Sequence, residues 1–158
     1  MGVRRYRLDK AFERTLQGMR LRRPQREALE EFHSLIIKLD DDLWRLSGEE
    51  VGSRIRELRP DFSFAEGHPS LTSVLATGVG KTRLMGAVMA YLFLGEQADT
   101  FAIFAPRTAI LRKLVREASP TNPKYLFVDP GLVPAPTLWH AQNLDRFCLL
   151  YTSDAADE

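Results

Sequence analysis

The sequence is poor in cysteine, in clustered histidine and in long apolar runs. Its single cysteine among 158 residues is Cys148, so cysteine usage says nothing about the redox compartment. The three histidines, His33, His68 and His140, are scattered and lack the spacing of metal ligands. The longest apolar run, around residues 87–94, is too short to cross a bilayer. These absences argue against a metal-binding module and against a membrane span.

The N-terminal segment also lacks the apolar core of a signal peptide, and we therefore expect a cytoplasmic protein. This segment is instead rich in arginine, in two groups that include Arg4, Arg5 and Arg7, and then Arg20, Arg22 and Arg23. Such cations can contact phosphate groups, although a basic cluster is more often a solvated surface. The overall net charge is only +1, so composition alone does not predict nucleic-acid binding.

The last eleven residues, CLLYTSDAADE, differ in character from the rest of the chain. They match a reading frame of the transposase adapter used in sequencing libraries. We therefore expect residues 148–158 to be an adapter-derived tail and the natural sequence to diverge after Phe147. This tail carries Asp154, Asp157 and Glu158 and no basic residue, so the remaining chain would be more basic than the whole.

Hydrophobic periodicity divides the rest of the chain into a helical part and an α/β part. Residues 1–66 contain a helical stripe after Pro24 and a shorter helix before Pro60, followed by a loop. In residues 67–147, short apolar runs at 71–75, 100–105 and 125–128 alternate with helical patterns at 84–94 and 110–118. Alternating strands and helices predict a parallel sheet with helices on both faces and a ligand at the carboxyl ends of the strands.

The most informative stretch is LTSVLATGVGKT, residues 71–82. An apolar run precedes a turn with Gly78 and Gly80, and Lys81, Thr82 and a long apolar helix follow. Glycines allow backbone N–H groups to surround phosphate oxygens at a helix N-terminus. The lysine supplies a charge for the β- and γ-phosphates, and the threonine hydroxyl suits Mg²⁺. The pattern predicts an ATP–Mg²⁺ site, although Leu75 stands where the strict phosphate-loop pattern has glycine.

Three segments in this order resemble the superfamily 2 DEAD/DEAH-like helicases. The segment LRRPQREALEEF (residues 21–32) looks like the glutamine-containing motif of that superfamily, LATGVGKTRLMGA resembles motif I, and FAIFAPRTAILRKL resembles motif Ia. The residues of the last two segments are most similar to those of the R (Res) subunits of type III restriction enzymes. The resemblance implies an incomplete RecA-like P-loop NTPase domain at 67–147, preceded by the helical segment.

The resemblance also implies roles for particular residues. Gln25 would contact adenine, and the phosphate loop would bind ATP through Thr77, Gly78, Val79, Gly80, Lys81 and Thr82. Lys81 and Thr82 would take part in catalysis, with Thr82 on Mg²⁺. Ala105, Pro106, Arg107 and Thr108 would lie near DNA. The alternatives without a functional role are that Gln25 is an exposed residue of a first helical turn and that Arg107 is an exposed residue at a helix start. DNA is the implied partner, together with a modification or specificity subunit of a restriction system.

One element of this family pattern is missing from the sequence. The acidic motif that positions Mg²⁺ and activates water, of the form D-E-x-H, does not occur. We therefore expect the chain to be the ATP-binding fragment of an ATP-dependent DNA helicase or translocase, weak in nucleotide binding and inactive alone. Two alternatives stay open: a P-loop module of another class, such as a kinase or AAA-type protein, and a non-functional truncated polypeptide.

Overall fold

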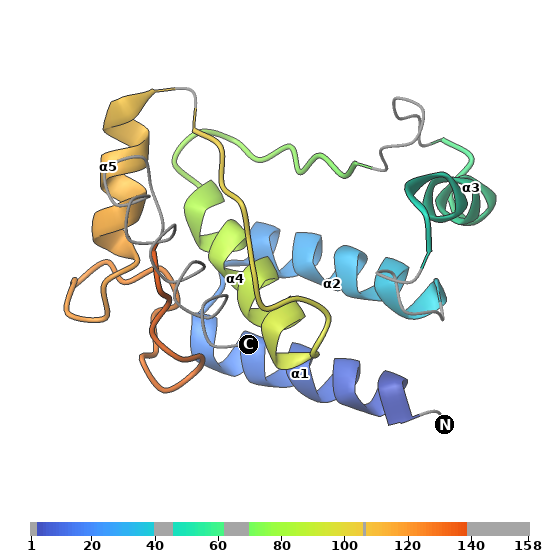
Figure 1. Cartoon of the computed structure of the whole chain (residues 1–158), viewed down its shortest axis with the longest axis horizontal. Coiled ribbons are helices and arrows are strands. Elements are labelled where there is room, and N and C mark those ends of the chain that lie inside the picture. Colours follow the sequence, from blue (N-terminus) through green and yellow to red (C-terminus); the bar gives the residue numbers. More distant parts are fainter. Residues whose placement is uncertain (1–2, 40–45, 62–69, 106, 139–158) are drawn as a thin grey trace, which may run out of the picture.

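The computed structural model describes residues 3–39, 46–61, 70–105 and 107–138, which contain five helices (Figure 1). The helices are α1 (Val3–Met19), α2 (Arg23–Lys38), α3 (Gly48–Leu58), α4 (Lys81–Leu94) and α5 (Thr108–Glu117). The expected helices after Pro24, before Pro60, after Lys81 and around Ile110 are thereby confirmed. The expected adapter-derived tail lies outside the described residues.

The predicted parallel sheet is wrong for the described residues, which contain no β-strand. Residues 70–76 and 100–105 run as single extended segments in Figure 1, and Val74 and Phe104 are 92% and 94% exposed. The third expected strand is a buried series of turns, in which the Val128 N–H donates to the Tyr125 carbonyl. A strand is stable only when a neighbour completes its backbone hydrogen bonds, and short apolar runs do not by themselves specify that neighbour.

The starts of α2 and α3 follow from local sequence. Pro24 lies in the first turn of α2, where a missing N–H costs nothing because that group has no partner within the helix. Ser47 caps α3 by accepting a hydrogen bond from the Glu50 N–H, and the Glu50 carboxylate accepts one from the Ser47 N–H. This reciprocal arrangement satisfies two N–H groups that the helix leaves open.

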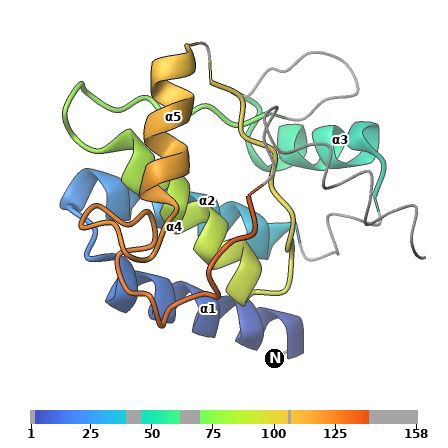
Figure 2. The same cartoon turned by 60° about the vertical axis from the view of Figure 1, so that its left-hand side comes forward.

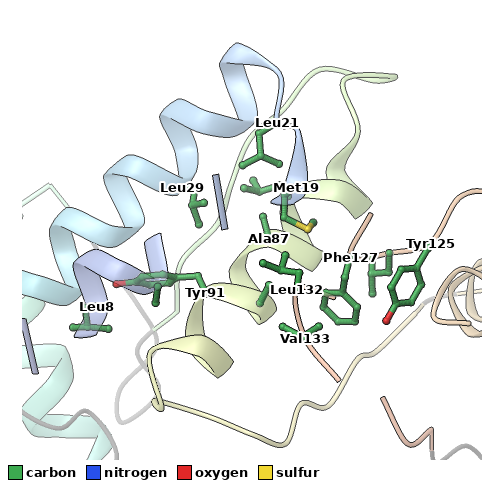
Figure 3. Packing of buried hydrophobic residues seen from close by; sticks show 14 of the residues in the cluster. Leu8, Met19, Leu21, Leu29, Ala87, Tyr91, Tyr125, Phe127, Leu132 and Val133 are labelled. Carbon is green, nitrogen blue, oxygen red and sulfur yellow. The ribbon is translucent and has the colours of Figure 1, made fainter. Parts of the chain in front are cut away.

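The main core forms where α4 packs against α1 and α2 (Figure 2). The α4 residues Ala87, Ala90 and Tyr91 are fully buried. In Figure 3, Tyr91 lies toward Leu8 of α1 while Ala87 lies between Met19 and the turn that carries Leu132. The apolar character of α4 on all sides is therefore explained by two helices and a buried turn, not by the predicted sheet.

A second, smaller core joins α2 to α3 through Leu35, Leu39, Val51 and Ile55. The fifth helix is less covered. Its apolar residues Leu111, Leu114 and Val115 line a hollow of about 450 Å³, which is also lined by parts of α4 and of residues 133–138. Within the described ranges, no helix is long and apolar enough to span a membrane.

Candidate nucleotide site

The phosphate-loop segment has the backbone that its glycines predict. Gly78 and Gly80 have φ angles of +84° and +98°, in the region that residues other than glycine rarely adopt. The Val79 N–H donates to the Ala76 carbonyl and closes the turn. Helix α4 then begins at Lys81, as predicted from the sequence, while the segment before the loop is extended chain instead of the predicted strand.

The first N–H groups of α4 are open. The Arg83 and Leu84 N–H groups donate to the Gly80 carbonyl, whereas those of Lys81 and Thr82 have no partner within the described part of the chain. Open N–H groups and the positive end of the helix dipole together attract anions such as phosphate. The loop therefore has both the shape and the polarity of an anion-binding turn.

Gln25, in the first turn of α2, joins that helix to the loop. Its Nε2 donates to the carbonyls of Val79 and Gly80 at 2.7 and 2.9 Å, and its Oε1 accepts from the Arg22 N–H at 2.8 Å. The side chain is only 2% exposed. The interpretation of Gln25 as an exposed surface residue is therefore wrong, because both amide hydrogens are used inside the protein.

The contact between Gln25 and the loop is also close. A Cβ atom added at Gly80 would lie 2.5 Å from Gln25 Nε2, a distance that real Cβ atoms do not tolerate. At position 80 the positive φ demands glycine, and any larger residue would in addition push the Gln25 amide away from the loop carbonyls. At Gly78 only the φ angle demands glycine, because nothing lies within 4 Å of an added Cβ.

A cavity of about 720 Å³ opens beside this loop. It is bounded by three parts of the chain: the loop with the start of α4, the α1–α2 connection, and α5 with the turn after it. Its volume lies within the range of about 300–1,000 Å³ that small-molecule sites occupy. The lining carries five cationic side chains, Arg20, Arg22, Arg83, Lys113 and Lys124, and a single carboxylate, Glu117.

Most of these cations have no carboxylate partner among the described residues. Lys113 lies 3.8 Å from the Glu117 carboxylate, one turn away on α5. For Arg20, Arg22, Arg83 and Lys124, the described ranges contain no ion pair. A concave surface with cations in excess raises the local concentration of anions.

The structure brings together most of the predicted nucleotide residues in one cavity lining, to which the described DNA residues do not belong. Gln25, Gly78, Val79, Gly80 and Thr82 line the cavity. Lys81 and Thr77 are exposed beside it and are not part of its lining. Ala105 is half-buried, Arg107 and Thr108 are exposed at the start of α5, and none of the three lines the cavity, while Pro106 lies outside the described residues.

Sequence comparison assigns the chain to a family. The model of the type III restriction enzyme res subunit matches residues 18–152, which covers the start of α2, the phosphate loop and α5. The chain belongs to this res-subunit family. Comparison with curated proteins and with solved structures gives no match.

Res subunits are the helicase-like, ATP-dependent members of restriction systems that act on DNA. The resemblance to type III restriction enzymes read from the motifs is thus confirmed. The geometry of the loop agrees with membership of an ATP-dependent family, because an anion-binding turn at a helix start is the part of such proteins that contacts phosphate.

Sequence reasoning singled out part of the cationic lining and missed the rest. The group containing Arg20 and Arg22 was visible as a basic cluster that could contact phosphate. Lys113 and Lys124 belong to no such cluster, and they reach the cavity because α5 and the following turn lie beside the loop. No spacing rule connects positions so far apart along the chain.

Proposed function

We propose that this res-subunit chain is the ATP-binding part of a DNA helicase or translocase in a restriction system. The observation that carries the proposal is the glycine turn at the start of α4, which presents open N–H groups beside a nucleotide-sized cavity rich in cations. Lys81 would contact the β- and γ-phosphates, and Thr82 would hold Mg²⁺ through its hydroxyl. Thr77, Gly78, Val79 and Gly80 would surround the phosphates with backbone.

For Gln25 we keep the proposed contact with adenine, with one condition set by the geometry. Both of its amide hydrogens already donate to loop carbonyls. Adenine would therefore have to use the remaining lone pair of Oε1 or to displace one of those carbonyls. We infer that adenine recognition and the position of the loop depend on one another.

Nucleotide turnover needs more than this site. No D-E-x-H string is present in the sequence, and phosphoryl transfer depends on an acidic group that positions Mg²⁺ and water. We therefore expect the chain to bind ATP–Mg²⁺ without rapid hydrolysis. Ala105, Pro106, Arg107 and Thr108 are the proposed DNA contacts, a modification subunit is the proposed partner, and the cytoplasm is the proposed compartment.

The test is the affinity of the 158-residue chain for ATP–Mg²⁺, measured by isothermal titration calorimetry. Lys81→Ala should weaken binding by about tenfold or more, because a hydrogen bond to a charged group is worth about 1.5–3 kcal/mol. Lys38→Ala is the matched control, since Lys38 is, like Lys81, an exposed lysine but lies in the last turn of α2, outside the phosphate loop. Equal affinities for the two variants would show that Lys81 does not contact phosphate.

A further inference from the structure

A second group of cations shares the cavity with the phosphate loop. Arg20 and Arg22 come from the connection between α1 and α2, and Lys124 comes from the turn after α5. These two segments line the same cavity as the loop, although they are about 100 residues apart in the sequence. We call Arg20, Arg22 and Lys124 the second cationic wall.

The charges of this wall are not neutralised within the described ranges. Lys113, another cation of the lining, has Glu117 beside it, but no such carboxylate is found for the three wall residues among the described residues. Arginine and lysine side chains of like charge repel one another, although solvent weakens the repulsion. An anion that enters the cavity would offset this repulsion and be attracted to each side chain. An anion with several charged groups could contact the wall and the loop at the same time, because both line one cavity.

Backbone conformation sets this cavity apart from the rest of the surface. Arg20 has a φ angle of +47° and Val128, another lining residue, has a φ angle of +64°. Both are positive, as at Gly78 and Gly80, so four of the residues that line this cavity have positive φ. Such conformations cost about 1–3 kcal/mol for residues other than glycine and cluster at ligand sites.

We propose that the second cationic wall binds the phosphate chain of the nucleotide and selects nucleoside triphosphates over shorter phosphate esters. This proposal rests on the proposed nucleotide site and adds residues outside the phosphate loop to it. The loop provides backbone N–H groups at one boundary of the cavity, and the wall provides side-chain charges at the other boundaries. A triphosphate has enough phosphate groups to interact with both, whereas a monophosphate engages the loop alone.

Inorganic tripolyphosphate, ATP and AMP are the probes, titrated separately into the 158-residue chain by calorimetry. Arg20→Asn removes the charge while asparagine tolerates the positive φ at this position, and Lys124→Ala removes the second charge. Each variant should weaken tripolyphosphate and ATP binding by about tenfold, which corresponds to the loss of one charge-assisted hydrogen bond. Binding of AMP should change by less than about twofold.

Two controls separate this effect from misfolding and from general charge. Arg14→Ala removes an exposed arginine of α1 that does not line the cavity, and its affinities should match those of the parent chain. Arg20→Lys keeps the charge and should recover most of the tripolyphosphate affinity. The far-ultraviolet circular dichroism of every variant should equal that of the parent chain.

The outcomes distinguish this proposal from the one on which it rests. If Lys81→Ala weakens ATP binding while Arg20→Asn and Lys124→Ala behave like Arg14→Ala, the nucleotide site stands and the second cationic wall is rejected. If the two wall variants weaken tripolyphosphate binding and Lys81→Ala does not, the wall binds phosphate but the proposed role of the loop is wrong. Equal losses for AMP and for ATP would remove the selectivity for triphosphates.

Discussion

Among single residues, Gln25 has an environment that tolerates little change. Its amide donates two hydrogen bonds to the carbonyls of Val79 and Gly80, and the group is almost completely buried. Gln25→Glu would remove both donors and place a carboxylate oxygen against carbonyl oxygens. We expect this change to lower the free energy of unfolding by about 1–3 kcal/mol.

Urea denaturation followed by circular dichroism measures this effect. Gln17→Glu, at an exposed position of α1, is the control and should leave the midpoint nearly unchanged. If both substitutions lowered stability equally, the hydrogen bonds to the loop would contribute nothing measurable, and charge alone would explain the loss.

At the scale of the helices, α4 closely approaches the buried turn at residues 125–128. A Cβ atom at Gly86 would lie 2.8 Å from the Leu126 carbonyl oxygen, and backbone cannot move aside as a side chain can. We expect Gly86→Ala to destabilise the protein by about 1–3 kcal/mol, even though alanine favours a helix over glycine by about 1 kcal/mol.

Gly18 of α1 provides the comparison for this substitution. A Cβ there would meet the Leu132 side chain at 2.9 Å, and that side chain can rotate away. Gly18→Ala should therefore cost less than Gly86→Ala, and thermal unfolding of the two variants measures the difference. A larger loss at Gly18 would mean that α1, and not α4, packs against the more rigid neighbour.

The elements also show which structural features follow from local sequence. The starts of α2 beside Pro24, of α3 after Ser47 and of α4 at Lys81 depend on residues within one turn, and the local sequence is compatible with each of them. Glycine spacing likewise predicted the phosphate loop. The prediction of three strands was wrong because apolar residues such as Phe104 and Leu126 favour burial or an extended backbone without specifying which segment pairs with them. The position of Gln25 against the loop depends on how α2 packs on α4, which no local pattern encodes.

For the molecule as a whole, the junction of α1, α2 and α4 contains a titratable group. His33 of α2 lies 3.2 Å from the Asp9 carboxylate of α1 through Nε2 and 2.9 Å from the Tyr91 hydroxyl of α4 through Nδ1. The partners imply that Nε2–H donates to Asp9 and that the Tyr91 O–H donates to Nδ1. The ring also stacks on Phe12 with the centroids 4.3 Å apart.

This junction should make stability depend on pH. The pKa of His33 lies below 6.5, and burial is the largest cause of this shift; Asp9 raises the pKa and Arg5 lowers it, but the net shift is downward. The unfolded chain therefore binds the proton on His33 more readily than the folded chain. The contribution of neutral His33 to the free energy of unfolding is thus complete above pH 6.5. It should decrease as the pH falls below that value and level off once the folded state is protonated too.

The check is the urea midpoint at several pH values between about 5 and 8, the range in which histidine titrates. His33→Gln keeps a donor and an acceptor at this position but cannot take up a proton, so its midpoint should vary less with pH over the same interval. An identical pH dependence in both proteins would assign the effect to carboxylates elsewhere.

Tyr91 at the same junction gives the protein an internal optical signal. Its ring is fully enclosed by the three helices, and burial raises the pKa of its phenol, with Asp9 adding to the effect. Burial also raises the pKa of Tyr125, whereas Tyr6 is more than half exposed. Phenolate absorbs at longer wavelength than phenol, so an alkaline titration reports the enclosed rings only when the helices separate. The ultraviolet absorbance of the unlabelled chain thus records the opening of its core.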